Sequence, residues 1–172
     1  VTLPSLTSVE VINAQSLGAL TIDTSAVAGV TNLNLLKVGA SKAVNLTAAA
    51  TTDIKVDMKS ASSTVTVNGG KDATAKITDV TGDQSLVKVI VGGTTAAKGA
   101  VVVDVAAEKA QDTSAKNVKL NAIEVTGGKT ISVEVSYTDD KGFATTVSAT
   151  DPTPVQLGAV PPAPATAAPT LF

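Results

Sequence analysis

The sequence predicts an all-β fold, and more specifically a β-solenoid, on three observations. Pairs of apolar residues two positions apart recur at short and nearly regular intervals, and such pairs point to one face of a strand. Ala, Thr and Val supply 77 of the 172 residues, and Thr and Val favour strands. Aromatic residues make up only 2%, which suits a thin interior filled by small aliphatic side chains. The pairs are Val9/Val11, Leu20/Ile22, Leu33/Leu35, Val44/Leu46, Ile54/Val56, Val65/Val67, Ala75/Ile77, Val89/Val91 and Val101/Val103.

The spacing of these pairs sets the expected size of one coil. Leu17, Leu20 and Ile22 form an L-x-x-L-x-I pattern like that of leucine-rich repeats. The period of about 11 residues is, however, half of the roughly 20–29 residues of such repeats. We therefore interpret each pair as half a coil, with about 22 residues per coil and a core that each coil completes against its neighbours.

Residues 1–112 are expected to hold these solenoid repeats. Glycine clusters such as Asn68-Gly69-Gly70 and Gly92-Gly93 supply the positive φ that tight turns between strands need. Residues 84–91 and 99–105 read as strands with denser apolar content. Residues 106–115 are the best helix candidate, with a loop as the alternative.

Residues 113–150 change in texture and are expected to form either the last coils or a small β module, sandwich-like or hairpin. Alternating apolar and polar residues predict strands over 118–125, 130–137 and 143–149. The polar stretch 138–142, which ends in Gly142, predicts a hairpin connection.

Residues 151–172 contain six of the seven prolines among Ala and Thr. Proline fixes φ and lacks a backbone donor, so this segment is not expected to form an inner strand. It reads as a semi-rigid linker, or an arm lying on a neighbour, with a tail that closes the module as the alternative.

Several kinds of chemistry are excluded by residues that the chain lacks. There is no Cys, no His and no Arg, so disulfides, cysteine or histidine catalysis and bidentate phosphate recognition are absent. The net charge of −2 gives no attraction to nucleic acid. No run of eighteen apolar residues predicts a membrane span, and no secretory signal begins the chain, which we expect to be a segment of a longer protein.

Calcium is the cofactor for which the sequence offers candidate ligands, because clustered carboxylates at turns can supply the oxygens that it requires. The alternative is that these are solvated turn carboxylates, since the Gly-Gly-x-Gly-x-Asp nonapeptide of calcium β-rolls is absent. The candidates are Asp72, Asp79, Asp83, Asp139 and Asp140.

Two further motifs have simpler explanations. Asp53 and Asp57 lie four residues apart on one expected strand face, as paired acids for glycoside chemistry would. Lys55 and Lys59 alternate with them, which is typical of a solvated strand face. Asn45-Leu46-Thr47 matches the N-glycosylation triplet, but Leu46 is expected to face inward.

Three stretches of the chain resemble bacterial surface-layer (S-layer) and S-layer-like proteins of the type I-secreted, RTX-related kind. They are Val9–Leu36, Val44–Val56 and Ala122–Ser136, which share the Ala/Thr/Val-rich texture, the few aromatics and the lack of Cys. The resemblance implies an extracellular β-solenoid that self-assembles into a two-dimensional array at the cell surface, commonly rigidified by calcium.

The leading hypothesis is a secreted structural protein without enzymatic activity, whose partners are copies of itself in a cell-surface lattice. Cell-surface polysaccharide is a further partner, expected through other parts of the parent chain. The alternative is a stalk or passenger segment of a large bacterial adhesin. A β-helical polysaccharide-acting enzyme is the third hypothesis, which the missing His, Arg and aromatic residues disfavour.

Overall fold

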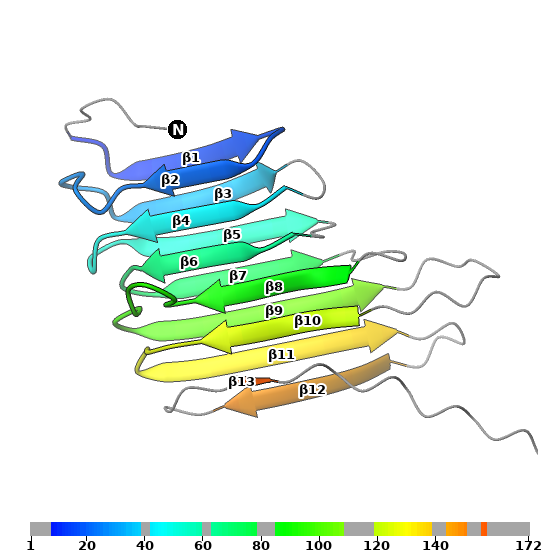
Figure 1. Cartoon of the computed structure of the whole chain (residues 1–172). Coiled ribbons are helices and arrows are strands. Elements are labelled where there is room, and N and C mark those ends of the chain that lie inside the picture. Colours follow the sequence, from blue (N-terminus) through cyan, green and yellow to red (C-terminus); the bar gives the residue numbers. More distant parts are fainter. Residues whose placement is uncertain are drawn as a thin grey trace, which may run out of the picture.

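The computed structural model describes residues 8–38, 42–59, 63–78, 85–108, 119–138, 144–150 and 156–157. These residues form thirteen strands and no helix, so the predicted all-β fold is confirmed (Figure 1). The strands are β1 (Val11–Ser16), β2 (Leu20–Asp23), β3 (Asn32–Val38), β4 (Val44–Ala48), β5 (Asp53–Lys59), β6 (Val65–Gly69), β7 (Ala73–Thr78), β8 (Ser85–Val91), β9 (Ala100–Glu108), β10 (Lys119–Val125), β11 (Thr130–Thr138), β12 (Ala144–Thr150) and β13 (Gln156–Leu157).

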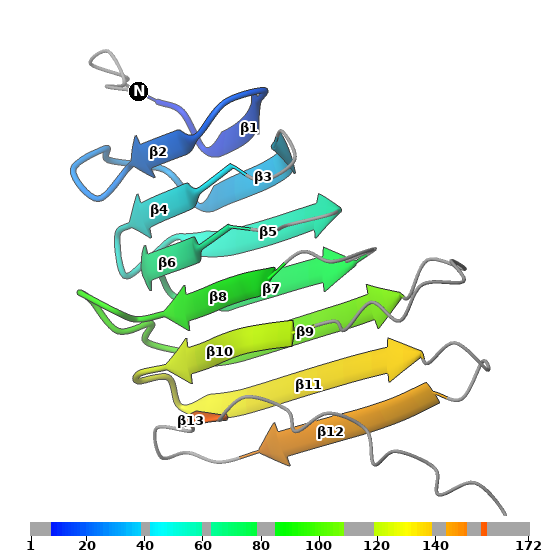
Figure 2. The same cartoon turned by 45° about the vertical axis from the view of Figure 1, so that its right-hand side comes forward.

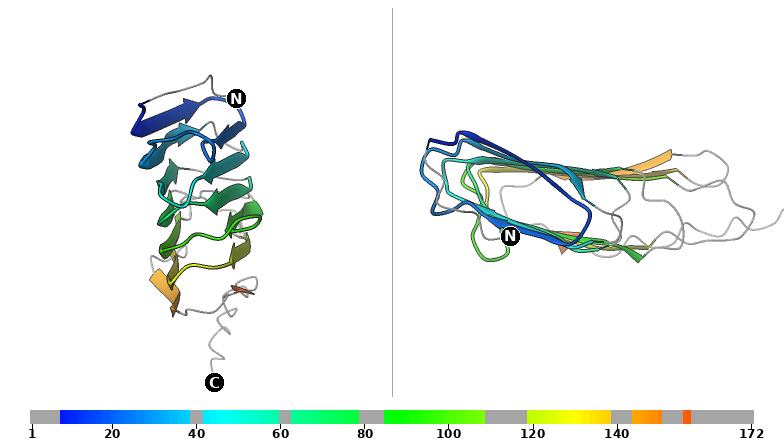
Figure 3. Two further views of the ribbon diagram at one scale, coloured as in Figure 1. Left: turned by 90° about the vertical axis from the view of Figure 1, so that its left-hand side faces the viewer. Right: turned by 90° about the horizontal axis from the view of Figure 1, so that it is seen from above.

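The chain alternates between two sheets, which gives the solenoid its flattened coil. Sheet A has the order β1-β3-β5-β7-β9-β11-β12, and sheet B has the order β13-β10-β8-β6-β4-β2. Neighbouring strands are parallel throughout, except that β12 and β13 run antiparallel to their partners. The two sheets face each other (Figure 2), and the view along the stack shows the strands of the coils on two long sides (Figure 3).

The register of the strands measures the length of each coil. Val11 pairs with Asn32, and Asn32 pairs in turn with Asp53, so the first coils have almost the predicted length. Later coils are longer, because Val101 pairs with Ile131. The predicted coil with two strands per turn is therefore confirmed, with longer connections in the C-terminal part.

The core is a set of aliphatic columns that run along the stack. Because the strands are parallel and in register, each inward residue packs on the equivalent residue of the next coil. One column of sheet B contains Ile22, Leu46, Val67, Val91 and Val125, all of them buried. Eight of the nine predicted pairs are buried.

The first predicted pair, Val9/Val11, is wrong. Val11 is 49% exposed, whereas Ala14 is buried and Ile12 packs against the core. The inward set of β1 is thus shifted by one residue, which period-2 spacing alone does not reveal when apolar residues occur on both faces. A bulge adds to the irregularity of the β1–β3 pairing. Leu35 and Lys37 of β3 pair with consecutive residues of β1, so Leu36 between them has no partner in β1, and its side chain is 51% exposed.

The C-terminal strands extend the two sheets. β10 pairs with β8 and β11 with β9, both parallel, and β12 returns beside β11 as an antiparallel hairpin. The helix candidate 106–115 is wrong at residues 106–108, which belong to β9 and continue its pairing with β11; the rest lies outside the described residues. Within 151–172, only Gln156 and Leu157 are described, and they pair with β10.

Candidate functional site

Many of the described polar residues with defined partners lie at one corner of the solenoid. We define the corner as the turns that lead from sheet B to sheet A together with the last two residues of each preceding strand, residues 22–31, 47–52, 68–72, 90–99 and 124–129. Backbone N–H groups there donate to the carbonyl oxygen of the neighbouring coil: Lys71 to Thr52 at 2.8 Å, Gly99 to Lys71 at 2.6 Å and Lys129 to Gly99 at 2.7 Å. The coil-to-coil ladder therefore continues around the corner and is not confined to the sheets.

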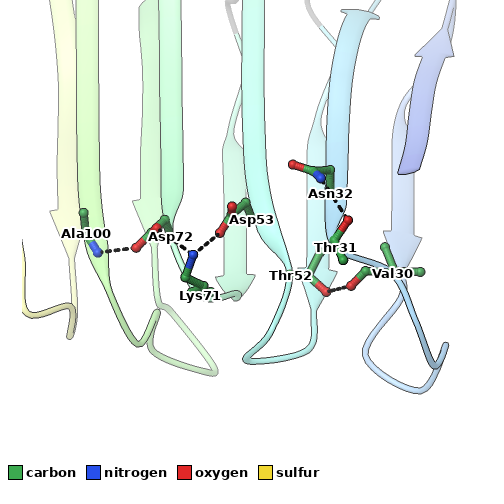
Figure 4. Close-up of polar contacts among 8 residues, drawn as sticks. All are labelled: Val30, Thr31, Asn32, Thr52, Asp53, Lys71, Asp72 and Ala100. Carbon is green, nitrogen blue, oxygen red and sulfur yellow. Dashed lines mark hydrogen bonds and ion pairs between the residues drawn. The ribbon is translucent and has the colours of Figure 1, made fainter. Parts of the chain in front are cut away.

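Threonine hydroxyls reinforce this ladder (Figure 4). Thr52 is fully buried, and its Oγ1 donates to the Val30 carbonyl oxygen at 2.7 Å. One coil earlier, the exposed Thr31 donates to the Glu10 carbonyl oxygen at 3.0 Å. Both bonds join neighbouring coils, so the threonines fix the position of one turn on the next.

Asp72, the one calcium candidate within the described residues, lies in this corner. Its Oδ1 accepts a hydrogen bond from the Ala100 backbone N–H at 2.7 Å, and its Oδ2 lies 3.6 Å from Lys71 Nζ (Figure 4). The carboxylate thus already has a structural role, because it satisfies the first N–H of β9. Among the described residues, no group of three or more acidic side chains is placed to hold a metal ion.

The other four calcium candidates lie outside the described residues. In the sequence, Asp79 and Asp83 fall between β7 and β8, and Asp139 and Asp140 fall between β11 and β12. For these four, calcium binding stays a prediction.

The paired acids of β5 differ in their surroundings. Asp53 Oδ1 lies 3.7 Å from Lys71 Nζ, which also contacts Asp72, so this lysine bridges two coils (Figure 4). Asp57 is exposed on the same outer face of sheet A, opposite Lys76 of β7. Lys76 Nζ in turn lies 3.7 Å from Oδ2 of the half-buried Asp104, so charges of both signs form a row across the sheet.

A buried amide links three coils and was not anticipated from the sequence. Asn68 is 4% exposed; its Oδ1 accepts hydrogen bonds from the Thr94 N–H at 2.9 Å and the Thr94 hydroxyl at 3.0 Å. Its Nδ2 donates to Asn45 Oδ1 at 3.2 Å. Asn-Gly-Gly indicated only a turn, because sequence spacing does not show that a corner loop from the next coil returns to the amide.

Leu46 of the glycosylation triplet is fully buried, as expected.

Two corner glycines permit close contact between coils. Gly69 and Gly92 have φ values of +70° and +80°, which side chains disfavour. A Cβ at Gly69 would collide with the Ala48 carbonyl oxygen, and one at Gly92 with the Thr126 carbonyl oxygen. The predicted turn glycines are therefore required both by φ and by the neighbouring coil.

Asp23, at the start of the corner, has its pKa held below the ordinary value. The Ser25 hydroxyl donates to Asp23 Oδ1 at 2.6 Å, and the Ser25 backbone N–H donates to the same oxygen at 2.8 Å. Both bonds favour the ionised carboxylate and outweigh its slight desolvation. This closes a local turn at the surface.

The described part of the chain contains no helix long and apolar enough to cross a membrane. The arrangement combines aliphatic columns inside with backbone groups and polar side chains that bond one coil to the next at the corner. Comparisons with protein-family models, with curated proteins and with solved structures find no match for this chain.

Proposed function

We propose that this chain is a structural component of a bacterial cell-surface layer, in which copies of it self-assemble outside the cell. The observation that carries the proposal is the continuous coil-to-coil ladder, which runs through both sheets and around the corner. A structure bonded in this way along its whole length resists bending and stretching, which is the property that a surface lattice requires.

The polar side chains support the same function. Thr52, Asn68 and Asp72 each form a hydrogen bond with a neighbouring coil. These polar groups therefore stabilise the stacking of the coils. The composition and sequence pattern of the repeats resemble those of S-layer proteins, which also supports a structural role at the cell surface.

Calcium enters the proposal as a stiffening ion at the connections that follow β7 and β11, where Asp79, Asp83, Asp139 and Asp140 fall in the sequence. Each connection contains two carboxylates, and these would share a cation with backbone carbonyl oxygens.

Negative-stain electron microscopy of the purified chain, with calcium and with a chelator, tests the proposal. We expect ordered sheets, tubes or bundled rods, with better order when calcium is present. Monomeric rods under both conditions would contradict a lattice and favour the stalk of a large adhesin.

The enzymatic alternative is tested separately. Asp53→Asn and Asp57→Asn would each abolish polysaccharide cleavage if β5 carried paired catalytic acids. We expect no cleavage by the unmodified chain, because Asp53 lies against Lys71 on an open sheet face.

A further inference from the structure

The two ends of sheet A differ from its interior in charge. The terminal strands β1 and β12 have the sequences VINAQS and ATTVSAT, without a charged residue or proline. Each of the five strands between them contains at least one charged residue, for example Lys37 in β3 and Glu134 in β11. Proteins usually place charges or proline on edge strands to prevent pairing with other chains, and here that protection is missing at both ends.

The edges of β1 and β12 are open within the described part of the chain. There, β1 pairs only with β3 and β12 pairs only with β11, and they lie at opposite ends of the stack (Figure 1). Among the residues that the structure describes, three of the four exposed large apolar side chains also lie in the first coil or beside it: Val11, Leu17 (84% exposed) and Leu36. Sheet B offers less, because its end strands have four and two residues and β2 ends in Asp23.

The strand directions make the two ends complementary. β1 to β11 run parallel, whereas β12 runs antiparallel to β11. A second copy stacked in the same orientation would therefore present its β1 antiparallel to β12, and antiparallel pairing is the slightly more stable kind. The lengths match as well, at six residues in β1 and seven in β12.

One register satisfies both strands. If Val11 pairs with Thr150, then Ile12 and Ala14 fall opposite Ala149 and Val147, which occupy the register positions of the buried Val133 and Val135 in β11. Positions that are in register with the buried residues of β11 then meet Ile12 and the buried Ala14 across the junction. The same register places the exposed Gln15 opposite the exposed Thr146.

We infer that copies of this chain join end to end, with β12 of one copy pairing antiparallel with β1 of the next, so that sheet A continues from molecule to molecule. This inference rests on the self-assembly proposed above and names the contact that produces it. The occupant of each sheet end is a second copy of this chain.

A charge-reversal set of variants tests the contact. Gln15→Lys with Thr146→Lys sets two lysines opposite each other at the junction, and we expect the association constant to fall by up to about fivefold. Gln15→Lys with Thr146→Glu sets opposite charges there, and we expect association at or above that of the unmodified chain. Sedimentation velocity over a concentration series measures the constants, and negative staining measures rod length.

The control places the same lysine pair inside the sheet. Val102 and Ser132 are exposed register partners in β9 and β11, so Val102→Lys with Ser132→Lys opposes two charges away from the ends. We expect this variant to associate like the unmodified chain. Circular dichroism of every variant checks that it is folded.

Each outcome decides between contacts. Equal weakening by the Lys/Lys and Lys/Glu variants would overturn the head-to-tail contact in favour of symmetric β1–β1 or β12–β12 pairing. Unchanged assembly of all variants would overturn the sheet-end contact while the proposed lattice function stands. A monomeric unmodified chain at every concentration would overturn both.

Discussion

The interior columns and the corner of this solenoid are built from opposite chemistry. The interior contains aliphatic side chains that repeat from coil to coil, such as Leu33 on Ile54 in sheet A. The corner contains glycines, hydroxyls, an amide and a carboxylate, each with a different partner in a neighbouring coil. Non-directional burial therefore supplies most of the stability, whereas the directional corner bonds determine how one coil is placed on the next.

Substitutions in the interior columns are expected to reduce stability most. Leu46→Ala removes a fully buried side chain from the middle of a column, and we expect a loss of about 2–5 kcal/mol in the free energy of unfolding. Urea denaturation measures this loss. Leu17→Ala, at an 84% exposed leucine, is the matched control and is expected to change stability by less than about 0.5 kcal/mol. Similar costs at both positions would contradict the assignment of the columns as the core.

The corner glycines are expected to come next. Gly69→Ala places a Cβ against the Ala48 carbonyl oxygen at a positive φ, and we expect a loss of about 1–3 kcal/mol. Gly18→Ala is the control, since Gly18 has no atom within 4 Å of its added Cβ and no positive φ. A thermal melt of each variant measures the difference. An unchanged melting temperature for Gly69→Ala would show that Gly69 and the Ala48 carbonyl of the neighbouring coil are not in close contact.

Two threonines that form the same kind of hydrogen bond test how much burial adds to its contribution to stability. Thr52→Val and Thr31→Val each remove a hydroxyl that donates to a carbonyl of the neighbouring coil, one buried and one exposed. We expect a loss of about 1–2 kcal/mol at Thr52, because the Val30 carbonyl oxygen loses a buried donor. At Thr31, where water replaces the donor, we expect less than about 0.5 kcal/mol. Equal losses in chemical denaturation would mean that burial does not set the strength of these bonds.

The pH dependence of stability that Asp23 contributes is expected to be smaller than any of these changes. Because the pKa of Asp23 is lowered in the folded chain, its contribution is present above the unfolded pKa of about 3.9 and is lost as pH falls through the folded value. Asp23 is exposed, so solvent screening holds the contribution to about 0.5 kcal/mol or less. We expect the stability difference between the unmodified chain and Asp23→Asn to shrink between pH 5 and about pH 2. A difference that grows over this range would contradict the sign.

The repeat was visible in the sequence because each coil must bury a pair of aliphatic residues, such as Leu20 and Ile22, at a fixed spacing. The strand over 130–137 and its antiparallel return were likewise predicted from alternation and the polar connection. The first strand was misassigned because Val9, Val11 and Ile12 offer apolar residues to both faces, and only pairing with β3 selects one.

The roles of the corner residues could not be predicted in the same way. Asp72 suggested a metal ligand because it lies between glycines and acids, but its partner is the Ala100 N–H, 28 residues along the chain. Asn68 and Thr94 are separated by 26 residues. The identity of such partners depends on coil length, which is not constant: the coil from Ile54 to its partner Ala73 is much shorter than the coil from Ala73 to Val101.

X-ray fibre diffraction from oriented assemblies of the chain tests directly whether its coils stack along the rod. Coils stacked along the rod, and rods joined through β12 and β1, place every strand one hydrogen-bonding step from the next. We therefore expect a sharp reflection at about 4.7–4.9 Å parallel to the long axis of the assembly. A reflection of this spacing perpendicular to that axis would contradict the end-to-end rod, and its absence from ordered assemblies would contradict the stacked coil.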